Sequence, residues 1–126
     1  MINIQKYILR HVAKVKIIHS MPGRIRLKVP NLNKVPEEFR NYDKFFIKAI
    51  RILDGIEDIS MNYLIGTTLI TYNSKVVYEE KIMRWIKIII DIGINNIIFI
   101  HQYGESNLEH VVSTLEQQLK EEVAKL

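Results

Sequence analysis

Residues 24–29 read Arg-Ile-Arg-Leu-Lys-Val, a strict alternation of cationic and aliphatic side chains. Successive side chains of a β-strand point to opposite faces of its sheet, so this alternation predicts a strand with one buried apolar face and one cationic face. Residues 15–20 form a second β-rich run. Met21-Pro22-Gly23 lies between the two runs and is a turn signal, because proline fixes φ and glycine accepts positive φ. The sequence therefore predicts a hairpin.

The length of the hairpin loop decides which residues share the cationic face. A two-residue loop would place Lys16 on the apolar face, which is costly. A three-residue loop places Lys14 and Lys16 beside the cations of the following strand. We therefore expect the second register, as a bulged hairpin or a kinked long strand. In this register Val15, Ile17 and His19 lie on the apolar face.

Beyond the hairpin, apolar periodicity predicts a helix, two short strands, a second helix and a last strand. These elements cover residues 39–54, 56–62, 68–72, 77–92 and 96–101. Gly55 and Gly93 directly follow the helical runs, and a glycine there commonly ends a helix, so we expect Gly55 to be a C-cap and Gly93 to stop the second helix. The order from residue 24 onward predicts an α+β ferredoxin-like βαββαβ sandwich, with residues 15–20 as an extra strand.

We expect one further helix at each end of the chain. Apolar residues at helical spacing in residues 1–13 predict a short N-terminal helical arm. Ser106 and Glu109 form a capping box that opens an amphipathic C-terminal helix. The apolar seam of that helix consists of Leu108, Val112, Leu115, Leu119 and Leu126. It packs either on its own domain or against a helix of a second copy, which would give a homo-oligomer. The predicted organisation is an arm over residues 1–13, a domain over residues 14–103 and a helix over residues 104–126.

The chain holds no cysteine, which removes disulfides, iron–sulfur ligation, zinc knuckles and cysteine nucleophiles together. It also lacks a phosphate-binding loop, a Gly-x-Ser-x-Gly elbow and a His-Glu-x-x-His motif, so an enzyme is not expected. The N-terminus has no signal-peptide pattern, and the most apolar window, residues 82–100, carries Arg84, Lys87 and Asp91. We expect a soluble, cytoplasmic protein, with a position at the periphery of a membrane as the alternative.

Charge is distributed unevenly along the chain. Residues 1–36 hold eight cations and no acid, whereas residues 37–126 hold ten cations and fourteen acids, so the net charge of +4 divides into +8 and −4. Such a basic segment favours an anionic partner, and a solvated face without a partner is the alternative. Arg24 and Arg26 lead the candidates because their planar guanidinium groups suit bidentate contacts with phosphate or carboxylate. The cations that would widen this site are Lys14, Lys16 and Lys28.

Two later segments resemble heavy-metal-associated domains, the modules found at the N-termini of transition-metal P-type ATPases. Leu53-Asp-Gly-Ile56 is similar to that family's Leu-Pro-Gly-Val at the end of its first helix. Asn62, Gly66 and Tyr72 match the family's Asn-x-x-x-Gly hairpin and the strand that follows it.

The segment of residues 19–30 resembles a cysteine-free branch of these domains, which occurs in metal-pumping ATPases and in stand-alone proteins. That branch carries Pro-Gly-Arg-x-Arg-Leu-x-Val-Pro, and this chain reads Pro-Gly-Arg-Ile-Arg-Leu-Lys-Val-Pro. The segment also resembles the Arg-x-x-Gly-Arg-Ile-Arg motif of ATPases linked to ferrosomes, the iron-storing membrane compartments of bacteria. Ser20 stands in place of that motif's first arginine.

The resemblance implies a non-catalytic accessory role in transition-metal handling, with iron as the metal and a metal-transporting P-type ATPase as the partner. Metal-carrying members hold Met-x-Cys-x-x-Cys after the first strand, because Cu(I) prefers two thiolates. In this chain the corresponding loop, residues 30–36, contains no sulfur. Thiolate transfer of copper or zinc is therefore chemically unavailable.

Several partners would suit the cationic strand: the ATPase or another acidic protein, an anionic membrane surface, or a phosphate-rich iron deposit. Nucleic acid is disfavoured, because base stacking needs exposed aromatic side chains between the cations, and this strand has none.

Two other functions stay open at this stage. His19 is a candidate ligand for iron or haem, with a packed core histidine as the alternative. Glu105, Glu109 and His110 offer hard ligands for iron, although the capping box explains Glu109 more simply. The second open function is that of a structural protein that assembles with itself through open sheet edges and the C-terminal seam.

Overall fold

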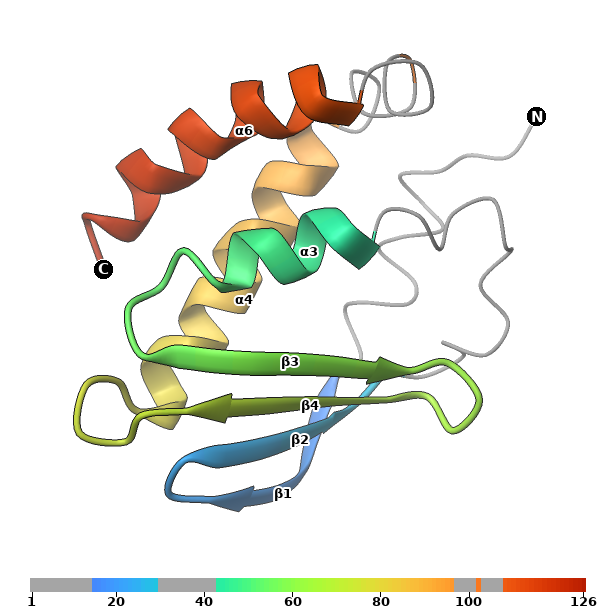
Figure 1. The fold of residues 1–126 in the computed structure, drawn as a ribbon, viewed down its shortest axis with the longest axis vertical. Helices are drawn as coiled ribbons and strands as arrows, with labels where there is room; N and C mark the ends of the chain where they lie inside the picture. The colour runs from blue at the N-terminus through green and yellow to red at the C-terminus, as the bar shows by residue number, and fades with distance from the viewer. Residues whose placement is uncertain (1–14, 30–42, 97–101, 103–107) are drawn as a thin grey trace.

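A computed structural model describes residues 15–29, 43–96, 102 and 108–126 (Figure 1). In chain order its elements are β1 (Lys16–Met21), β2 (Arg24–Lys28), α3 (Asp43–Ile50), β3 (Ile56–Asn62), β4 (Thr67–Tyr72), α4 (Glu79–Asn95) and α6 (Leu108–Val123). The predicted N-terminal arm, Lys14 and residues 97–101 of the predicted last strand lie outside the described residues. Asn96 itself lies in a turn after α4.

The four described strands form one antiparallel sheet in the order β1-β2-β4-β3. Strands β2, β4 and β3 take the order of the first, third and second strands of a ferredoxin-like sandwich. Strand β1 adds to the edge beside β2 as the predicted extra strand. The α+β ferredoxin-like prediction is therefore confirmed.

One face of the sheet is apolar and packs with α3 and α4 into the core. Ile25 and Leu27 of β2 and Ile70 of β4 are buried in one cluster with Trp85 of α4. The Trp85 Nε1–H donates a hydrogen bond to the Ala49 carbonyl of α3 at 3.1 Å, which links the two helices. In Figure 1, α4 passes behind the sheet, and no described helix crosses the face turned toward the viewer.

The C-terminal helix α6 packs on its own domain, against α3 and α4 (Figure 1). Its side chains Val111, Leu115 and Leu119 are buried in the common core. Leu115 and Leu119 belong to the predicted seam, and Leu126 is partly buried against the same core. The described part of the seam is therefore covered by the chain itself, and a homo-oligomer through this helix stays a prediction.

Both glycines predicted to end helices have other roles. Helix α3 ends at Ile50, and Gly55 instead precedes β3 with a φ of 98°. Helix α4 continues through Gly93 to Asn95. A helical glycine costs only about 1 kcal/mol, and the burial of neighbouring apolar side chains such as Ile89 and Ile92 outweighs that cost.

Candidate functional site

The turn between β1 and β2 consists of Pro22 and Gly23 alone, because Met21 and Arg24 are direct cross-strand partners. Gly23 has a φ of 89°, and a proline followed by such a glycine is typical of a type II turn. The Tyr72 N–H donates to the Gly23 carbonyl at 2.9 Å, and the Tyr72 hydroxyl donates to the Met21 carbonyl at 3.5 Å. The predicted turn is thus anchored to β4 and sets where the cationic strand begins.

A β-bulge at Ile18 decides which residues of β1 face outward. The register shifts between Ile17 and His19, so Lys16 pairs with Lys28, whereas His19 pairs with Arg26. Direct cross-strand partners share a face, so Lys16 and His19 both lie on the outer side of the sheet. The prediction was right for Lys16 and wrong for His19. The predicted three-residue loop is also wrong: the loop has two residues, and the bulge at Ile18 reverses the alternation of side chains between the two paired segments of β1.

The outer side of β2 carries three cations. Ile25 and Leu27 are 0% and 3% exposed, which fixes Arg24, Arg26 and Lys28 on the opposite side. Arg24 and Lys28 are exposed, Arg26 is half-buried, and the Cα atoms of the two arginines are about 7 Å apart along the strand. We call the surface formed by Lys16, Arg24, Arg26 and Lys28 the cationic face.

The outer surface continues across β4 and β3 through five polar residues and Leu69. Arg24, Arg26 and Lys28 pair with Thr71, Leu69 and Thr67 of β4. Those residues pair in turn with Asp58, Ser60 and Asn62 of β3. Two threonine hydroxyls therefore lie beside the cations and can contribute to binding an oxygen-rich ligand. Sequence reasoning missed Thr67 and Thr71, although the alternation of residues 67–72 is the signal that could have found them.

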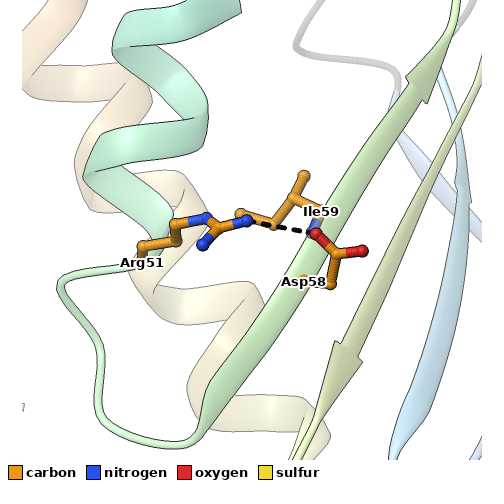
Figure 2. Close-up of polar contacts among 3 residues, drawn as sticks. All are labelled: Arg51, Asp58 and Ile59. Carbon is orange, nitrogen blue, oxygen red and sulfur yellow. Dashed lines mark hydrogen bonds and ion pairs between the residues drawn. The ribbon is translucent and has the colours of Figure 1, made fainter.

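No ion pair within the described residues neutralises the cationic face. Asp58 is the acid aligned with Arg24 through Thr71, and its Oδ1 is engaged elsewhere (Figure 2). The Arg51 Nη2 donates to that oxygen at 3.1 Å, and the Ile59 N–H donates to it at 2.9 Å. The other described ion pairs lie between Lys120 and Glu116 and between Lys125 and Glu122, all in the C-terminal segment.

Lys28 is the cation of this face with a described hydrogen bond inside the chain. Its Nζ donates to the Ile65 carbonyl in the β3–β4 turn at 2.6 Å. An ammonium has three N–H donors, so the bond orients Lys28 and leaves donors for a ligand. The arginines have no such bond among the described residues, and their guanidinium groups can take planar, bidentate contacts with carboxylate or phosphate.

The described outer face carries no phenylalanine, tyrosine or tryptophan. Tyr72 of β4 lies on the inner face and is buried. Base stacking on a sheet needs exposed rings, so the described strands offer no platform for single-stranded nucleic acid.

The described residues bring together no cluster of metal-binding side chains. The chain has no cysteine, and no group of three or more histidine, aspartate or glutamate side chains comes together in the described segments. His19 lies on the exposed strand β1 and is the cross-strand partner of Arg26, whose positive charge disfavours a cation there. Glu109 and His110 are both exposed on α6, and Glu105 lies outside the described residues. Iron or haem binding by His19 stays a prediction.

No helix in the described segments is long and apolar enough to cross a membrane. Among protein families, the model of heavy metal associated domain 2 matches residues 5–125. No curated protein and no solved structure matches the chain. The family match therefore extends from the N-terminal segment to the C-terminal helix.

Proposed function

The chain belongs to the heavy metal associated domain 2 family, and we propose that it is a non-catalytic accessory module that assists iron transport by docking on an acidic protein surface. Family membership supports a role in metal handling. The choice of iron is supported by the resemblance of residues 19–30 to the ferrosome-linked motif. The partner we propose is the cytoplasmic part of a metal-transporting P-type ATPase, which would place this module at the periphery of that membrane.

The observation that carries the proposal is the cationic face. Lys16, Arg24, Arg26 and Lys28 share one side of the sheet, and no acid of the described residues pairs with them. Like charges this close repel one another, so an acidic partner would relieve their repulsion and gain charge-assisted hydrogen bonds. The face is a feature of β1 and β2, the hairpin that includes the family-like segment.

The absence of cysteine favours docking over metal carriage. A module without thiolates, and without a cluster of other ligands in its described residues, has no means there of holding the metal while it is transferred. The proposed role is therefore to recognise or position the transporter, while the metal is bound by other protein groups.

The test is binding to the purified cytoplasmic domains of the metal-transporting ATPase from the same organism, measured by calorimetry at low and moderate salt. The double variant Arg24→Gln/Arg26→Gln removes two charge-assisted contacts, each worth about 1.5–3 kcal/mol, so binding should weaken by at least a hundredfold. Wild-type affinity should also fall as salt rises, because salt screens exposed charges.

The matched control is Lys120→Gln/Lys125→Gln, which lowers the net charge by the same amount on the C-terminal segment, away from the sheet. Its binding should stay within a few-fold of the wild type. Equal loss in both double variants would show a general charge effect and would contradict docking through the cationic face. Co-sedimentation of the same two double variants with ferric phosphate particles tests the phosphate-rich iron deposit as the alternative partner.

A further inference from the structure

The β3–β4 turn projects two apolar side chains from one end of the sheet. Leu64 is 86% exposed and Ile65 is 52% exposed, which makes Leu64 the most exposed large apolar residue described. Figure 1 shows this turn at the end of the sheet opposite the β1–β2 turn and the β4–α4 connection. Nearly the whole leucine side chain is therefore in contact with water, at a cost that its burial in a partner would recover.

Hydrogen bonds hold this turn in a defined shape. The Asn62 Oδ1 accepts the N–H groups of Leu64 at 3.0 Å and Ile65 at 3.2 Å. The Gly66 N–H donates to the Asn62 carbonyl at 2.9 Å, and Gly66 takes a φ of 71°. The two apolar side chains thus project from an organised turn, so little conformational freedom is lost when they are buried.

Cations lie beside the apolar tip. Lys28 bonds to the Ile65 carbonyl, and Lys16 is the direct cross-strand partner of Lys28. The acids of the described strands, Glu57 and Asp58, lie in the first half of β3, at the opposite end of the sheet. This end therefore combines exposed apolar side chains with positive charge and no strand acid.

We propose that the β3–β4 turn inserts Leu64 and Ile65 into the interfacial region of an anionic lipid bilayer, while Lys16 and Lys28 contact the lipid headgroups. The chemistry is that of peripheral membrane binding, in which apolar burial and attraction to anionic lipids add. A protein partner would bury about 800 Å² on each side, which suits a broad surface. A tip of two adjacent side chains is convex and suits a fluid bilayer, which closes around it.

The inference rests on the proposed function only through the shared lysines. Arg24 lies at the opposite end of β2, next to the Pro22-Gly23 turn, so the arginine contacts and the lipid contacts can be separated by mutation. Bilayer contact at the β3–β4 turn would hold the module beside a membrane-embedded transporter while the arginines dock on it.

Flotation of the full chain with vesicles tests the proposal. Wild-type protein should float with phosphatidylcholine–phosphatidylglycerol vesicles and much less with phosphatidylcholine alone. Leu64→Ser/Ile65→Ser should lower partitioning by on the order of a hundredfold, from the burial of two aliphatic side chains. Lys16→Gln should lower it by about fivefold, the effect of one cation near an anionic surface.

Val76→Ser is the matched control, because Val76 is 55% exposed in the β4–α4 connection at the opposite end of the sheet. It should bind vesicles as the wild type does. In Leu64→Trp, the emission of the new indole should shift to the blue on vesicle addition, while Trp85 is fully buried and should contribute a constant signal.

Three results would overturn the inference: no binding to anionic vesicles, undiminished binding by Leu64→Ser/Ile65→Ser, or equal losses in that variant and in Val76→Ser. A change of oligomeric state in light scattering, without lipid binding, would assign the tip to a second copy instead. Arg24→Gln/Arg26→Gln should keep lipid binding and lose ATPase binding. That result would show that the arginine contacts and the β3–β4 turn act as separate surfaces.

Discussion

Replacing Gly55 with alanine should destabilise the fold severely, because two independent costs meet at this position. Gly55 has a φ of 98°, in the region that a side chain disfavours. A Cβ added there would lie 2.7 Å from Val77 Cγ1 and 3.1 Å from Val77 Cβ. The Asn73 N–H donates to the Gly55 carbonyl at 2.7 Å, so the backbone is held in place and cannot easily relax.

The magnitude follows from these two terms. A non-glycine residue in a left-handed conformation costs roughly 1–2 kcal/mol. The contact with Val77, which is 2% exposed, is about 1 Å shorter than a normal carbon–carbon contact, and such overpacking costs about 1–3 kcal/mol. Together they predict a loss of about 3 kcal/mol in the free energy of unfolding, or a fall in Tm of about 10 °C.

Urea unfolding followed by Trp85 fluorescence measures this loss, since Trp85 is the single tryptophan and is fully buried. Gly93→Ala is the matched control: Gly93 lies within α4, and nothing lies within 4 Å of an added Cβ. That variant should gain about 0.5–1 kcal/mol, because alanine is the better helix former. The two glycine substitutions should therefore have opposite signs.

A double-mutant cycle separates the steric term from the backbone term. Val77→Ala removes the closest atom, so Gly55→Ala should cost at least about 1 kcal/mol less in that background than in the wild type. Strict additivity of the two substitutions would refute the contact. A loss below about 0.5 kcal/mol for Gly55→Ala alone would refute the whole account of this position.

The remaining predictions concern the helices. Trp85→Phe should lower the free energy of unfolding by about 2 kcal/mol, roughly half from the lost hydrogen bond to Ala49 and half from the lost ring volume. The Ala49 carbonyl still accepts the Ile52 N–H at 3.2 Å in this variant, so it is not left without a partner. A larger loss in thermal or urea unfolding would contradict this estimate. Leu115→Ala should cost about 2–5 kcal/mol in the same assay, because Leu115 is 1% exposed within one chain. The molecular mass in light scattering should stay unchanged, and dissociation of an oligomer by this variant would show that α6 packs between copies.

The sequence predicted the elements of the cationic face better than their exact pairing. The alternation of residues 24–28 placed Ile25 and Leu27 inside and Arg24, Arg26 and Lys28 outside, as the structure shows. His19 was placed on the wrong face, because a bulge inserts Ile18 between two paired segments of β1. A bulged hairpin was expected, because a regular two-residue loop would turn Lys16 inward, but nothing in residues 15–20 alone shows which residue is the extra one. That position depends on how the two strands fit together.

Helix ends were harder to predict than helices. Gly55 and Gly93 each followed an apolar periodic run, and glycine is a common helix terminator. Helix α3 ends earlier than expected, and Gly55 instead lies where the backbone passes close to Val77 and leaves no room for a Cβ. Helix α4 continued through Gly93, because its apolar neighbours are buried. In both cases contacts between distant segments overrode a local preference.

The amino-acid sequence by itself determined the chemistry and the local geometry of this protein. It contains no thiolate for metal, and its Pro22-Gly23 turn and alternating cations follow from backbone conformation and the two-residue period of a strand. Only the tertiary structure decided which cations share a face with Thr67 and Thr71, and that Arg51 engages Asp58. The reason is physical: a strand's period is local, whereas its register depends on contacts between residues far apart in the chain, and a shift of one residue reverses every face.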